Sequence, residues 1–438
     1  MKNVHEIKSM RTHYTEEVSQ EMDGKTVIVA GWVHELRDMG KLKFILLRDR
    51  TGIIQITAKK GIVPDEVFDV HLVKETVIRV EGKVRKEKQA PEGREIVPEK
   101  IEILGEVSTK IPFEVTGKVP ADLDVRLDKR YVDLRRKETS AIFKIQNEVN
   151  SAFREKLLSL GFQEIVPPCI VAAATEGGTN LFPIIYFEKE AFLGQSPQLY
   201  KQMAVVGGMD RVFMTVPAFR AEKHNTVTHL NEVLQMDIEM GFADHNNVMD
   251  VLAKVLIHIL KRVDENSKKE LEVLGQKLVV PKEVKKYDYT WIIEQLKKNG
   301  VDIEWGQDFG REEEREIAKI IPDEAYFITD WPTKIRAFYS MPNSKKPEIC
   351  NAFDLIYRGL EISSGAQRIH LPELLVQQLK NRGLNPDDFE FYINAFRCGA
   401  PPHGGWSIGM ERITMKITGQ TNIRECSMFP RDRTRLTP

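Results

Sequence analysis

The stretch PAFRAEKHNTVTHLNE, residues 217–232, has the pattern of a strand, a polar turn and a second strand. Arg220 and Glu222 are two residues apart, so an extended chain directs both side chains to the same face of a sheet. A guanidinium binds phosphate through two parallel hydrogen bonds, and a carboxylate accepts a hydrogen bond from an exocyclic amine. The pattern therefore predicts either a nucleotide contact or, as the simpler alternative, a salt bridge between neighbouring strands.

The stretch EISSGAQRIH, residues 361–370, combines side chains that bind ions of opposite charge. A carboxylate such as Glu361 holds a metal ion, whereas a hydroxyl such as Ser364 and a guanidinium such as Arg368 hold an anion. A nucleotide next to a small acid would meet both demands. A polar turn between two strands is the alternative.

A third polar stretch, GGWSIGMER at residues 404–412, places glycines around Trp406 and ends on Arg412. Glycines let a ligand approach the backbone closely, and an arginine plane stacks on a nucleotide base. The alternative is a glycine-rich turn before a helix. Two further polar stretches are ATEGGTNLF at 174–182 and GQSPQLYKQ at 194–202.

The composition, with 42% hydrophobic and 29% charged residues, is that of a soluble globular protein, and 438 residues predict two or three domains. The 64 basic and 65 acidic residues nearly cancel, so any nucleic-acid site must be a local patch. Four widely spaced cysteines argue against a disulfide framework or a zinc ribbon. The sequence has no P-loop, no apolar signal-peptide core and no run of 18 apolar residues. We therefore expect a cytoplasmic protein without a membrane span.

Residues 25–105 contain about five short strands separated by turns. Apolar residues alternate in the first strand, as at Val27 and Val33, and Arg50-Thr51-Gly52 marks a hairpin. This pattern predicts a small β-barrel, for which the OB-fold is the commonest five-stranded choice. An SH3-like barrel and the edge of a sandwich are the alternatives.

Beyond the barrel, proline, glycine and mixed charge without a sustained period predict a linker. A helix is predicted from an N-cap at Thr139 or Ser140 to Gly161, and the apolar stripe Val248 to Leu260 predicts a second helix. Strand-like pieces separated by single helices predict an α+β fold with an antiparallel sheet. We thus expect three parts: a barrel domain at 1–105, a linker at 106–136 and a larger domain at 137–438.

Taken together, these stretches resemble the motifs of one family. FRAE…HLNE and GGWSIGMERI are similar to motifs 2 and 3 of class II aminoacyl-tRNA synthetases, and GFQEIVPP, which ends at Pro168, is similar to motif 1. ATEGG, QSPQLYKQ, EISSGAQRIH and the C-terminal MFPRDRTRLTP complete a set of seven ordered motifs. Over residues 11–438 the chain closely resembles aspartyl-tRNA synthetases of the archaeal and eukaryotic type.

The resemblance implies an architecture and a set of partners. It implies an N-terminal OB-fold that binds the anticodon, a hinge and a class II catalytic domain on an antiparallel sheet. It implies L-aspartate, ATP with Mg²⁺, and tRNA as the molecules bound. The similarity to motif 1 implies a homodimer formed through the helix of residues 140–160 and the strand that ends at Pro168.

The resemblance also implies which residues bind each substrate. Those implied for ATP are Arg220, Ala221, Glu222, Thr228, His229, Leu230, Glu361, Gly409, Met410, Glu411 and Arg412. Those implied for aspartate are Glu176, Ser196, Gln198, Leu199, Tyr200, Lys201, Arg220, Ser364 and Arg368. The implied Mg²⁺ ligands are Asp354, Glu361 and Ser364, and the implied catalytic residues are Arg220, Glu361 and Arg412.

In the implied reaction, the α-carboxylate of aspartate attacks the α-phosphorus of ATP, giving aspartyl-adenylate and pyrophosphate. The terminal adenosine hydroxyl of tRNA then attacks the carbonyl. Because two anions must meet, fixed cations and a metal ion must neutralise their charge. Arg220 is implied to bridge the α-phosphate and the α-carboxylate, and Arg412 to cover the adenine and reach the γ-phosphate. Glu176 and Gln198 are implied to hold the α-ammonium group.

Two positions depart from the family pattern. Thr228 stands where an arginine often precedes the motif 2 histidine, and Val233 stands where an aromatic residue is frequent. A threonine carries no charge for a phosphate, and a valine does not stack on adenine. We expect His229 and Arg412 to supply the missing contacts.

The nearest alternative is an asparaginyl-tRNA synthetase, and the amino-acid pocket decides between the two. Lys201 and Arg368 would be two cations facing one side-chain carboxylate, which favours aspartate over a neutral amide. An enzyme that makes free asparagine would lack the barrel domain. A non-catalytic tRNA-binding paralogue would be expected to lose the residues Arg220, Glu361 or Arg412.

On the barrel, Arg37, Phe44 and Gln55 match positions where the family binds the anticodon. His34 and Pro91 match two positions near the third anticodon base; there Trp and Lys accompany restriction to tRNA(Asp), whereas His and Pro accompany charging of tRNA(Asn) as well. Core packing is the alternative for Phe44, a plain strand face for His34 and a turn for Pro91. We therefore predict a non-discriminating enzyme, with a discriminating one as the alternative.

Overall fold

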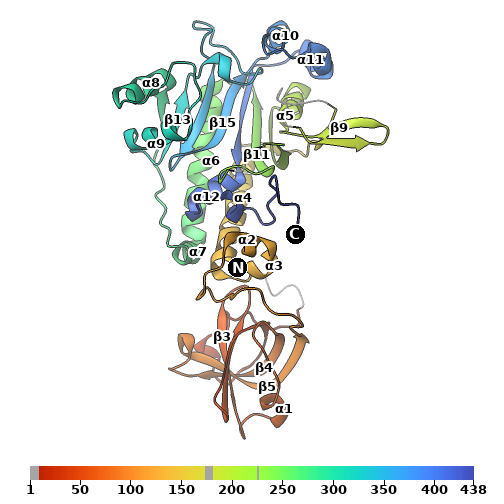
Figure 1. Ribbon diagram of the computed structural model, residues 1–438, viewed down its shortest axis with the longest axis vertical. Coiled ribbons are helices and arrows are strands. Elements are labelled where there is room, and N and C mark those ends of the chain that lie inside the picture. The colour runs from red at the N-terminus through yellow and green to blue at the C-terminus, as the bar shows by residue number, and fades with distance from the viewer. Residues whose placement is uncertain (1–8, 173–180, 224–225) are drawn as a thin grey trace. The chain divides into compact units, whose positions relative to one another are not determined.

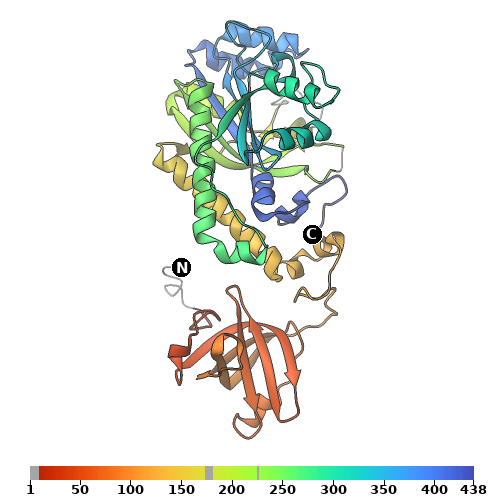
Figure 2. The same ribbon diagram turned by 90° about the vertical axis from the view of Figure 1, so that its left-hand side faces the viewer.

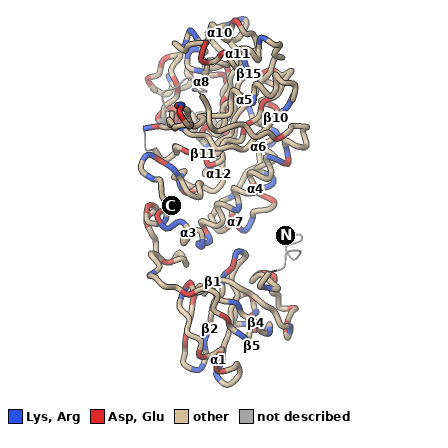
Figure 3. Tube along the Cα trace, turned by 90° about the vertical axis from the view of Figure 1, so that its right-hand side faces the viewer, with Lys and Arg blue, Asp and Glu red and all other residues tan. Residues whose placement is uncertain are grey.

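The computed structural model describes residues 9–172, 181–223 and 226–438. The chain folds as two compact units, Met1–Arg126 and Leu127–Pro438 (Figure 1). In both units Lys and Arg are interspersed with Asp and Glu along the trace, in agreement with the net charge of −1 (Figure 3). Within the described part of the chain, no helix is both long and apolar enough to cross a membrane.

The N-terminal unit is a closed five-stranded barrel with the strand order β1-β2-β3-β5-β4. Its elements are β1 (Thr26–Asp38), β2 (Leu42–Arg48), β3 (Ile53–Lys59), the short helix α1 (Asp65–Phe68), β4 (Val77–Lys86) and β5 (Arg94–Gly105). Antiparallel pairing of β1 with β4 and parallel pairing of β3 with β5 close the barrel. Alternate apolar residues such as Val29, Ile45 and Val80 fill its interior. The predicted OB-fold is confirmed.

The C-terminal unit is built on an eight-stranded sheet with the order β12-β13-β14-β15-β16-β11-β10-β6. Its inner strand pairs are antiparallel, and its two outermost pairs, β12 with β13 and β6 with β10, are parallel. The predicted α+β class with an antiparallel sheet is therefore confirmed. The strands are β6 (Gln163–Glu164), β10 (Arg211–Phe219), β11 (Glu232–Gly241), β12 (Lys285–Asp288), β13 (Ala325–Thr329), β14 (Ala352–Tyr357), β15 (Leu360–Arg368) and β16 (His403–Gly409).

Two long helices, α4 (Lys137–Ser159) and α6 (His245–Asn266), lie side by side against one face of this sheet (Figure 2). Their apolar stripes share one core with Ile238 of β11 and Trp406 of β16. The predicted end of α4 is confirmed, because Gly161 adopts a left-handed φ of 78° just after the helix. The predicted N-cap is wrong: α4 begins at Lys137, and Thr139 is buried within its first turn.

Shorter elements complete the C-terminal unit. The strands β7 (Ile170–Val171), β8 (Pro183–Tyr186) and β9 (Lys189–Leu193) form a separate small sheet. The remaining helices are α5 (Gln198–Ala204), α7 (Lys268–Val273), α8 (Tyr289–Lys298), α9 (Arg311–Ile320), α10 (Pro372–Asn381), α11 (Glu390–Arg397) and α12 (Met410–Thr418).

The segment predicted to be a linker, residues 106–136, contains two short helices, α2 (Leu123–Asp128) and α3 (Arg130–Asp133). The division between the two compact units falls inside this segment, after Arg126. Its role as a hinge, and the domain limits drawn from the sequence, stay predictions.

Candidate active site

The polar residues gather on the face of the sheet opposite α4 and α6. On β11, Met236 and Ile238 point into the helix-covered core, so Gln235 and Asp237 point to the other face. The strand register sets Asp354 opposite Ser364, Ser364 opposite Ser407, and Ser407 opposite Asp237. Directly paired residues lie on the same face of a sheet, so four neighbouring strands contribute one polar row.

Two cavities open over this row and share part of their lining. The larger, of about 420 Å³, is lined by Ser196, Gln198, Lys201, Arg220, Arg336 and Arg368, among others. The smaller, of about 170 Å³, is lined by Glu222, Thr228, His229, Glu361, Glu411 and Arg412, among others. Arg220, Gln235, Ser364 and Ser407 line both. The predicted aspartate residues that line a cavity thus lie in the larger one, the predicted ATP residues that line a cavity lie in the smaller one, and Arg220 and Ser364 lie in both.

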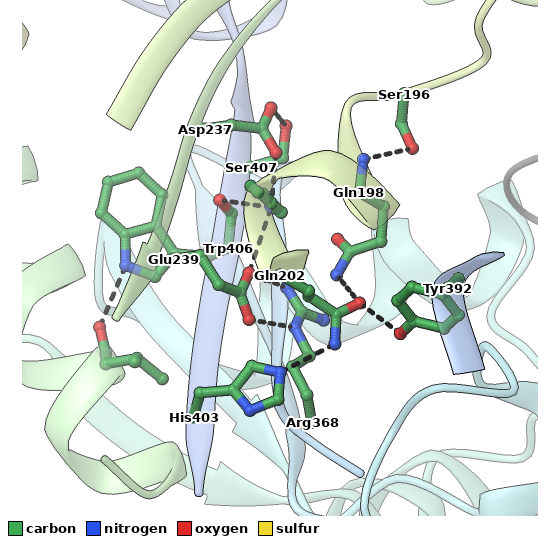
Figure 4. A network of polar contacts seen from close by, with 12 residues as sticks. Ser196, Gln198, Gln202, Asp237, Glu239, Arg368, Tyr392, His403, Trp406 and Ser407 are labelled. Atoms are coloured by element: carbon green, nitrogen blue, oxygen red, sulfur yellow. Dashed lines mark hydrogen bonds and ion pairs between the residues drawn. The ribbon is translucent and has the colours of Figure 1, made fainter. Parts of the chain in front are cut away.

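Four buried charged groups, Lys201, Asp237, Glu239 and Arg368, form one network, and all but Glu239 line the larger cavity. Figure 4 shows Asp237, Glu239 and Arg368 of this network. Nζ of Lys201 lies 2.5 Å from Oδ1 of Asp237 and 3.6 Å from Oε2 of Glu239. Arg368 donates to Glu239 through Nε at 3.0 Å and through Nη2 at 3.3 Å. The two cations therefore already face two carboxylates. The expectation of two cations for one substrate carboxylate did not include Asp237 and Glu239, so charge alone does not select aspartate.

The glycines of GGWSIGMER have structural uses that the sequence did not reveal. A Cβ at Gly405 would collide with the Glu239 carboxylate and with the carbonyl of Ile238. The glycine therefore gives room to a buried carboxylate rather than to a ligand. Trp406 is fully buried in the core, and its indole N–H donates to the Val248 carbonyl at 3.1 Å.

In the smaller cavity, Arg412 lies between Glu361 and His229. Its Nη1 donates to the Glu361 carbonyl at 3.1 Å, and its Nη2 lies 3.2 Å from Nε2 of His229. A guanidinium only donates, so Nε2 of His229 accepts and Nδ1 carries the proton. Nδ1 lies 2.6 Å from Oγ1 of Thr226 and 3.1 Å from Oγ1 of Thr228. Thr228, at the first departure from the family pattern, thus orients His229.

Glu361 and Asp354 are carboxylates of neighbouring strands. Burial, and then the negative charge of Asp354, raises the pKa of Glu361 to about 7. Arg336 donates from Nη1 to Oδ2 of Asp354 at 3.0 Å and from Nη2 to Oγ of Ser364 at 3.0 Å. Two hard oxygen ligands with surplus negative charge fit Mg²⁺, which proteins bind through one or two carboxylates together with substrate phosphates. Within the described residues, no cluster of three or more His, Cys, Asp or Glu side chains forms a closed metal site.

Some predicted residues are largely buried in the core. The side chains of Leu199 and Met410 lie in hydrophobic clusters and line neither cavity, so they could meet a substrate only through the backbone. Leu230 also belongs to a hydrophobic cluster, but it lines the smaller cavity. The Glu411 carboxylate accepts hydrogen bonds from the Leu234 backbone at 3.1 and 3.2 Å, and burial raises its pKa to about 7. Ala221 is not among the residues that line either cavity. Burial raises the pKa of half-buried Tyr200.

Two further predictions in this unit concern Gly409 and Glu176. Gly409 lines the smaller cavity, directly before α12. Glu176, predicted to hold the α-ammonium group, lies outside the described residues.

Sequence reasoning missed Asp237, Glu239 and Arg336. The first two could have been found, because carboxylates two residues apart on a strand whose other face is apolar need buried cations. Arg336 lies outside every singled-out stretch, and its position near Asp354 arises only from the fold.

The outer face of the barrel carries the residues predicted to meet the anticodon. Arg37 pairs with Phe44, Phe44 with Thr57, and Leu46 with Gln55, so their side chains share the face of β1, β2 and β3 opposite the interior. Phe44 is only partly buried and does not belong to the barrel core, so the core alternative for it is wrong. Gln55 donates from Nε2 to Glu95 at 2.9 Å.

His34 and Pro91 lie elsewhere on the barrel unit. His34 sits where a register shift interrupts the pairing of β1 with β2, and its Nδ1 lies 2.7 Å from Nη1 of Arg48. Pro91 is exposed at the start of a short 3₁₀ turn, Pro91–Gly93, before β5.

Comparison with known families decides the assignment. The model of the class II tRNA synthetases (D, K and N) matches residues 122–433, and that of the OB-fold nucleic acid binding domain matches residues 27–104. The chain belongs to the class II tRNA synthetases. This synthetase is 52% identical to the aspartate–tRNA(Asp/Asn) ligase of Methanocaldococcus jannaschii, over 99% of this chain and all of that one. It is 51% identical to the ligase of that name from Methanopyrus kandleri, over 98% of this chain and all of that one.

Solved structures agree with this assignment. The asparaginyl-tRNA synthetase of Pyrococcus horikoshii, complexed with asparaginyl-adenylate, superimposes with a TM-score of 0.92 at 35% identity, covering 97% of this synthetase and 99% of that chain. The aspartyl-tRNA synthetase of Entamoeba histolytica superimposes with a TM-score of 0.86 at 31% identity, covering 97% and 92%. The fold is therefore shared by aspartate and asparagine enzymes, and the choice of amino acid has to come from the site.

Proposed function

We propose that this synthetase is an aspartate–tRNA ligase that charges both tRNA(Asp) and tRNA(Asn). Full-length relatives at about 50% identity carry that description. The observation that carries the choice of aspartate is the position of Arg368, buried in the wall of the larger cavity together with Lys201 and next to two carboxylates. The alternatives are a ligase restricted to tRNA(Asp) and an asparaginyl-tRNA synthetase.

The donors of Arg368 and Lys201 favour an amino acid whose side chain offers only acceptors. Arg368 uses Nε and Nη2 for Glu239, and its Nη1 makes no hydrogen bond to any described residue. Lys201 directs its ammonium group to Asp237, Glu239 and the Trp406 carbonyl. A side-chain carboxylate accepts from Nη1 with either oxygen, whereas the NH₂ of asparagine would be a donor among donors.

In the proposed activation step, Arg220 holds the α-phosphate of ATP and the α-carboxylate of aspartate in contact. Its place in the lining of both cavities supports this role. The nucleophile is already ionised, so the protein contributes positioning and charge neutralisation rather than proton transfer. Arg412, held by the Glu361 carbonyl and by His229 in the smaller cavity, would cover the adenine and reach the γ-phosphate in this proposal. The terminal adenosine hydroxyl of tRNA then attacks the adenylate carbonyl.

We also propose that Glu361 and Asp354, with Ser364, hold Mg²⁺ against the ATP phosphates. When bound, the ion neutralises phosphate charge as the α-phosphorus is attacked. Glu361 and Ser364 line the smaller cavity. Burial, and then the charge of Asp354, raises the pKa of Glu361, so a bound cation would stabilise its ionised form. Arg336 shares Asp354 and Ser364, and so fixes the orientation of both side chains.

Amino-acid-dependent exchange of pyrophosphate into ATP tests the first part of the proposal. We expect exchange with aspartate and less than about one hundredth of that rate with asparagine at equal concentration, which corresponds to about 3 kcal/mol of discrimination. Equal rates, or faster exchange with asparagine, would reject the assignment to aspartate.

The breadth of tRNA charging needs its own experiment. His34 and Pro91 support charging of tRNA(Asn), because a small ring and an uncharged loop residue provide few contacts that would reject U in favour of C. Purified tRNA(Asn) transcript should accept labelled aspartate. A rate more than about a thousandfold below that for tRNA(Asp), roughly 4 kcal/mol, would restrict the enzyme to tRNA(Asp).

The proposed activity places the enzyme in the cytoplasm, in a host that also needs an amidotransferase to convert Asp on tRNA(Asn) into Asn.

A homodimer completes the proposal. The strand β6 lies at the edge of the large sheet, and apolar residues that follow it in the sequence are exposed, Val166 at 90% and Ile170 at 46%. An exposed strand edge with apolar neighbours favours pairing with a second copy. Sedimentation at micromolar concentration should give twice the chain mass of 50.3 kDa, and a single 50 kDa species would reject the dimer.

A further inference from the structure

Behind the larger cavity, Gln198 is the first member of a buried chain of hydrogen bonds (Figure 4). Nε2 of Gln198 lies 2.8 Å from Oε1 of Gln202, one turn further along α5. Gln202 also contacts Tyr392 of α11 and His403 of β16. Gln198 is 4% exposed, and the other three side chains are fully buried. Three elements that are distant in sequence thus meet behind one amide of the cavity wall.

The Pro401 carbonyl determines which atoms donate and which accept along this series of hydrogen bonds. It lies 2.8 Å from Nδ1 of His403 and can only accept, so Nδ1 carries the proton. Burial lowers the pKa of His403, so the ring is neutral and Nε2 is an acceptor. Nε2 lies 2.9 Å from Nε2 of Gln202, which must therefore donate.

The order of donors and acceptors continues to the cavity. Because its Nε2 faces His403, Gln202 presents Oε1 to its other neighbours. That oxygen accepts from the Tyr392 hydroxyl at 2.9 Å and from Nε2 of Gln198 at 2.8 Å. Gln198 has therefore turned its NH₂ group away from the cavity that it lines, and its Oε1 is the atom left for a ligand.

We propose that Gln202, Tyr392 and His403 are positioning residues that hold the Gln198 carbonyl toward the cavity as an acceptor for the α-ammonium group of the amino acid. The proposal rests on the proposed function, in which Gln198 binds that group. None of the three lines the larger cavity, so they act on the substrate through Gln198. If the amide of Gln202 were reversed, Gln198 would turn its NH₂ group toward the cavity. An NH₂ group only donates hydrogen bonds, so it could not accept one from the ammonium group.

The pair Gln202→Met and Gln202→Glu separates orientation from packing. Methionine fills a similar volume without an acceptor, so the Gln198 amide loses its anchor, and KM for aspartate should rise at least about tenfold. The glutamate carboxyl, protonated on the oxygen that faces Nε2 of His403, keeps its other oxygen toward Gln198 as an acceptor, so KM should stay within about threefold of the parent value. KM for ATP and kcat in pyrophosphate exchange should be unchanged in both. Equal KM values for aspartate in the two variants would overturn the proposal.

A double-mutant cycle tests whether Gln202 acts through Gln198. If it does, Gln198→Met with Gln202→Met should have the same KM for aspartate as Gln198→Met alone. If the double variant raised KM for aspartate by the product of the two single-variant increases, the proposal would be overturned. Inhibition by succinate, which lacks the ammonium group, should be equal in the parent and Gln202→Met. A parallel loss of succinate binding would mean general distortion of the cavity and would also overturn it.

Tyr392→Phe gives a milder, independent test, because it removes one hydroxyl from the network. KM for aspartate should rise about threefold, with no change in KM for ATP. An unchanged KM for aspartate would contradict the proposal. Failure of the proposed function is a different result, namely no aspartate-dependent exchange by the parent enzyme.

Discussion

Nη1 of Arg48 lies 2.7 Å from Nδ1 of His34, and the same guanidinium donates to both carboxylate oxygens of Glu75, at 3.0 and 2.8 Å. Because a guanidinium only donates, Nδ1 of His34 accepts, and the proton of the neutral ring is on Nε2. Burial, and then the charge of Arg48, lowers the pKa of His34, which keeps the ring neutral. The ring therefore offers an N–H donor, and the pyrimidine O2 is an acceptor in both C and U.

Replacing Arg48 by leucine should destabilise the barrel unit. Glu75, 5% exposed, would lose its bidentate partner, and breaking a buried ion pair costs about 3–5 kcal/mol. We expect an unfolding transition of the barrel unit at lower temperature, with aspartate-dependent pyrophosphate exchange preserved. Calorimetry measures the transition, and Lys59→Leu, at an exposed position of the same barrel, is the control. An unchanged transition would show that the Arg48–Glu75 pair adds nothing to stability.

Phe44→Ala should weaken tRNA charging and leave amino-acid activation intact. Stacking of one base on an aromatic side chain is worth about 1–3 kcal/mol, so KM for tRNA should rise roughly 5- to 150-fold. Aminoacylation and pyrophosphate exchange, measured side by side, separate the two effects. Ile62→Ala, at an exposed apolar residue of the same unit, serves as the control. If both reactions fell equally, misfolding rather than loss of a base contact would be the cause.

Arg368→Leu should abolish activation of aspartate while the fold persists. In this variant Nζ of Lys201 would still lie 3.6 Å from Oε2 of Glu239, so the Glu239 carboxylate would keep one positively charged partner. Removing the charged partner of a substrate carboxylate costs roughly 3 kcal/mol or more, which predicts at least a hundredfold loss in pyrophosphate exchange. Arg397→Leu, on the surface of α11, is the matched control. Near-normal exchange by the Arg368 variant would refute the assignment of the pocket.

The pKa of Glu361, raised to about 7 by burial and by Asp354, predicts a pH-dependent need for Mg²⁺. Below pH 7 the carboxyl is largely protonated and binds a cation poorly, so the Mg²⁺ concentration for half-maximal exchange should fall as the pH rises from 6 to 8. High Mg²⁺ should move the midpoint of the pH profile downward, because metal and proton compete. A midpoint independent of Mg²⁺ would contradict the prediction.

The same shift has a consequence for stability. The pKa of Glu361 is higher in the folded protein than the ordinary value of 4.5, so the folded state binds the extra proton more tightly. Its contribution to stability is present below pH 4.5 and is lost as the pH rises through 7. In the Glu361→Gln variant, the stability difference from the parent should therefore change across that window.

Several elements could be predicted because their patterns are local. The alternation of β1 and the long apolar stripe of α6 are predicted correctly from the sequence, since each pattern repeats over many residues. The two helices in residues 106–136 were missed, because six and four residues are too few to show a helical period. The N-cap of α4 was misplaced, because a threonine at a plausible capping position packs into the core instead.

The candidate site was predicted only in part, for a different reason. Many residues of the singled-out motifs line the cavities, but several of their buried partners come from segments without a motif. Tyr392 looks like one more aromatic residue of an amphipathic helix, and only the fold brings it within 2.9 Å of Gln202. The charges of Asp237 and Glu239 were visible in the sequence, but their pairing with Lys201 and Arg368 depends on contacts across the sheet.

The strand β11 contributes alternate residues to the two cavities, with Val233 in the smaller, Asp237 in the larger and Gln235 in both, while the residues between them point into the core. A deletion of one residue would turn every later side chain to the wrong face. Change in this part of the enzyme over evolution is therefore confined to substitution at a constant length. New amino-acid specificities on this framework would have to arise by exchanging side chains in place, since insertion or loss of residues would destroy the core and the site together.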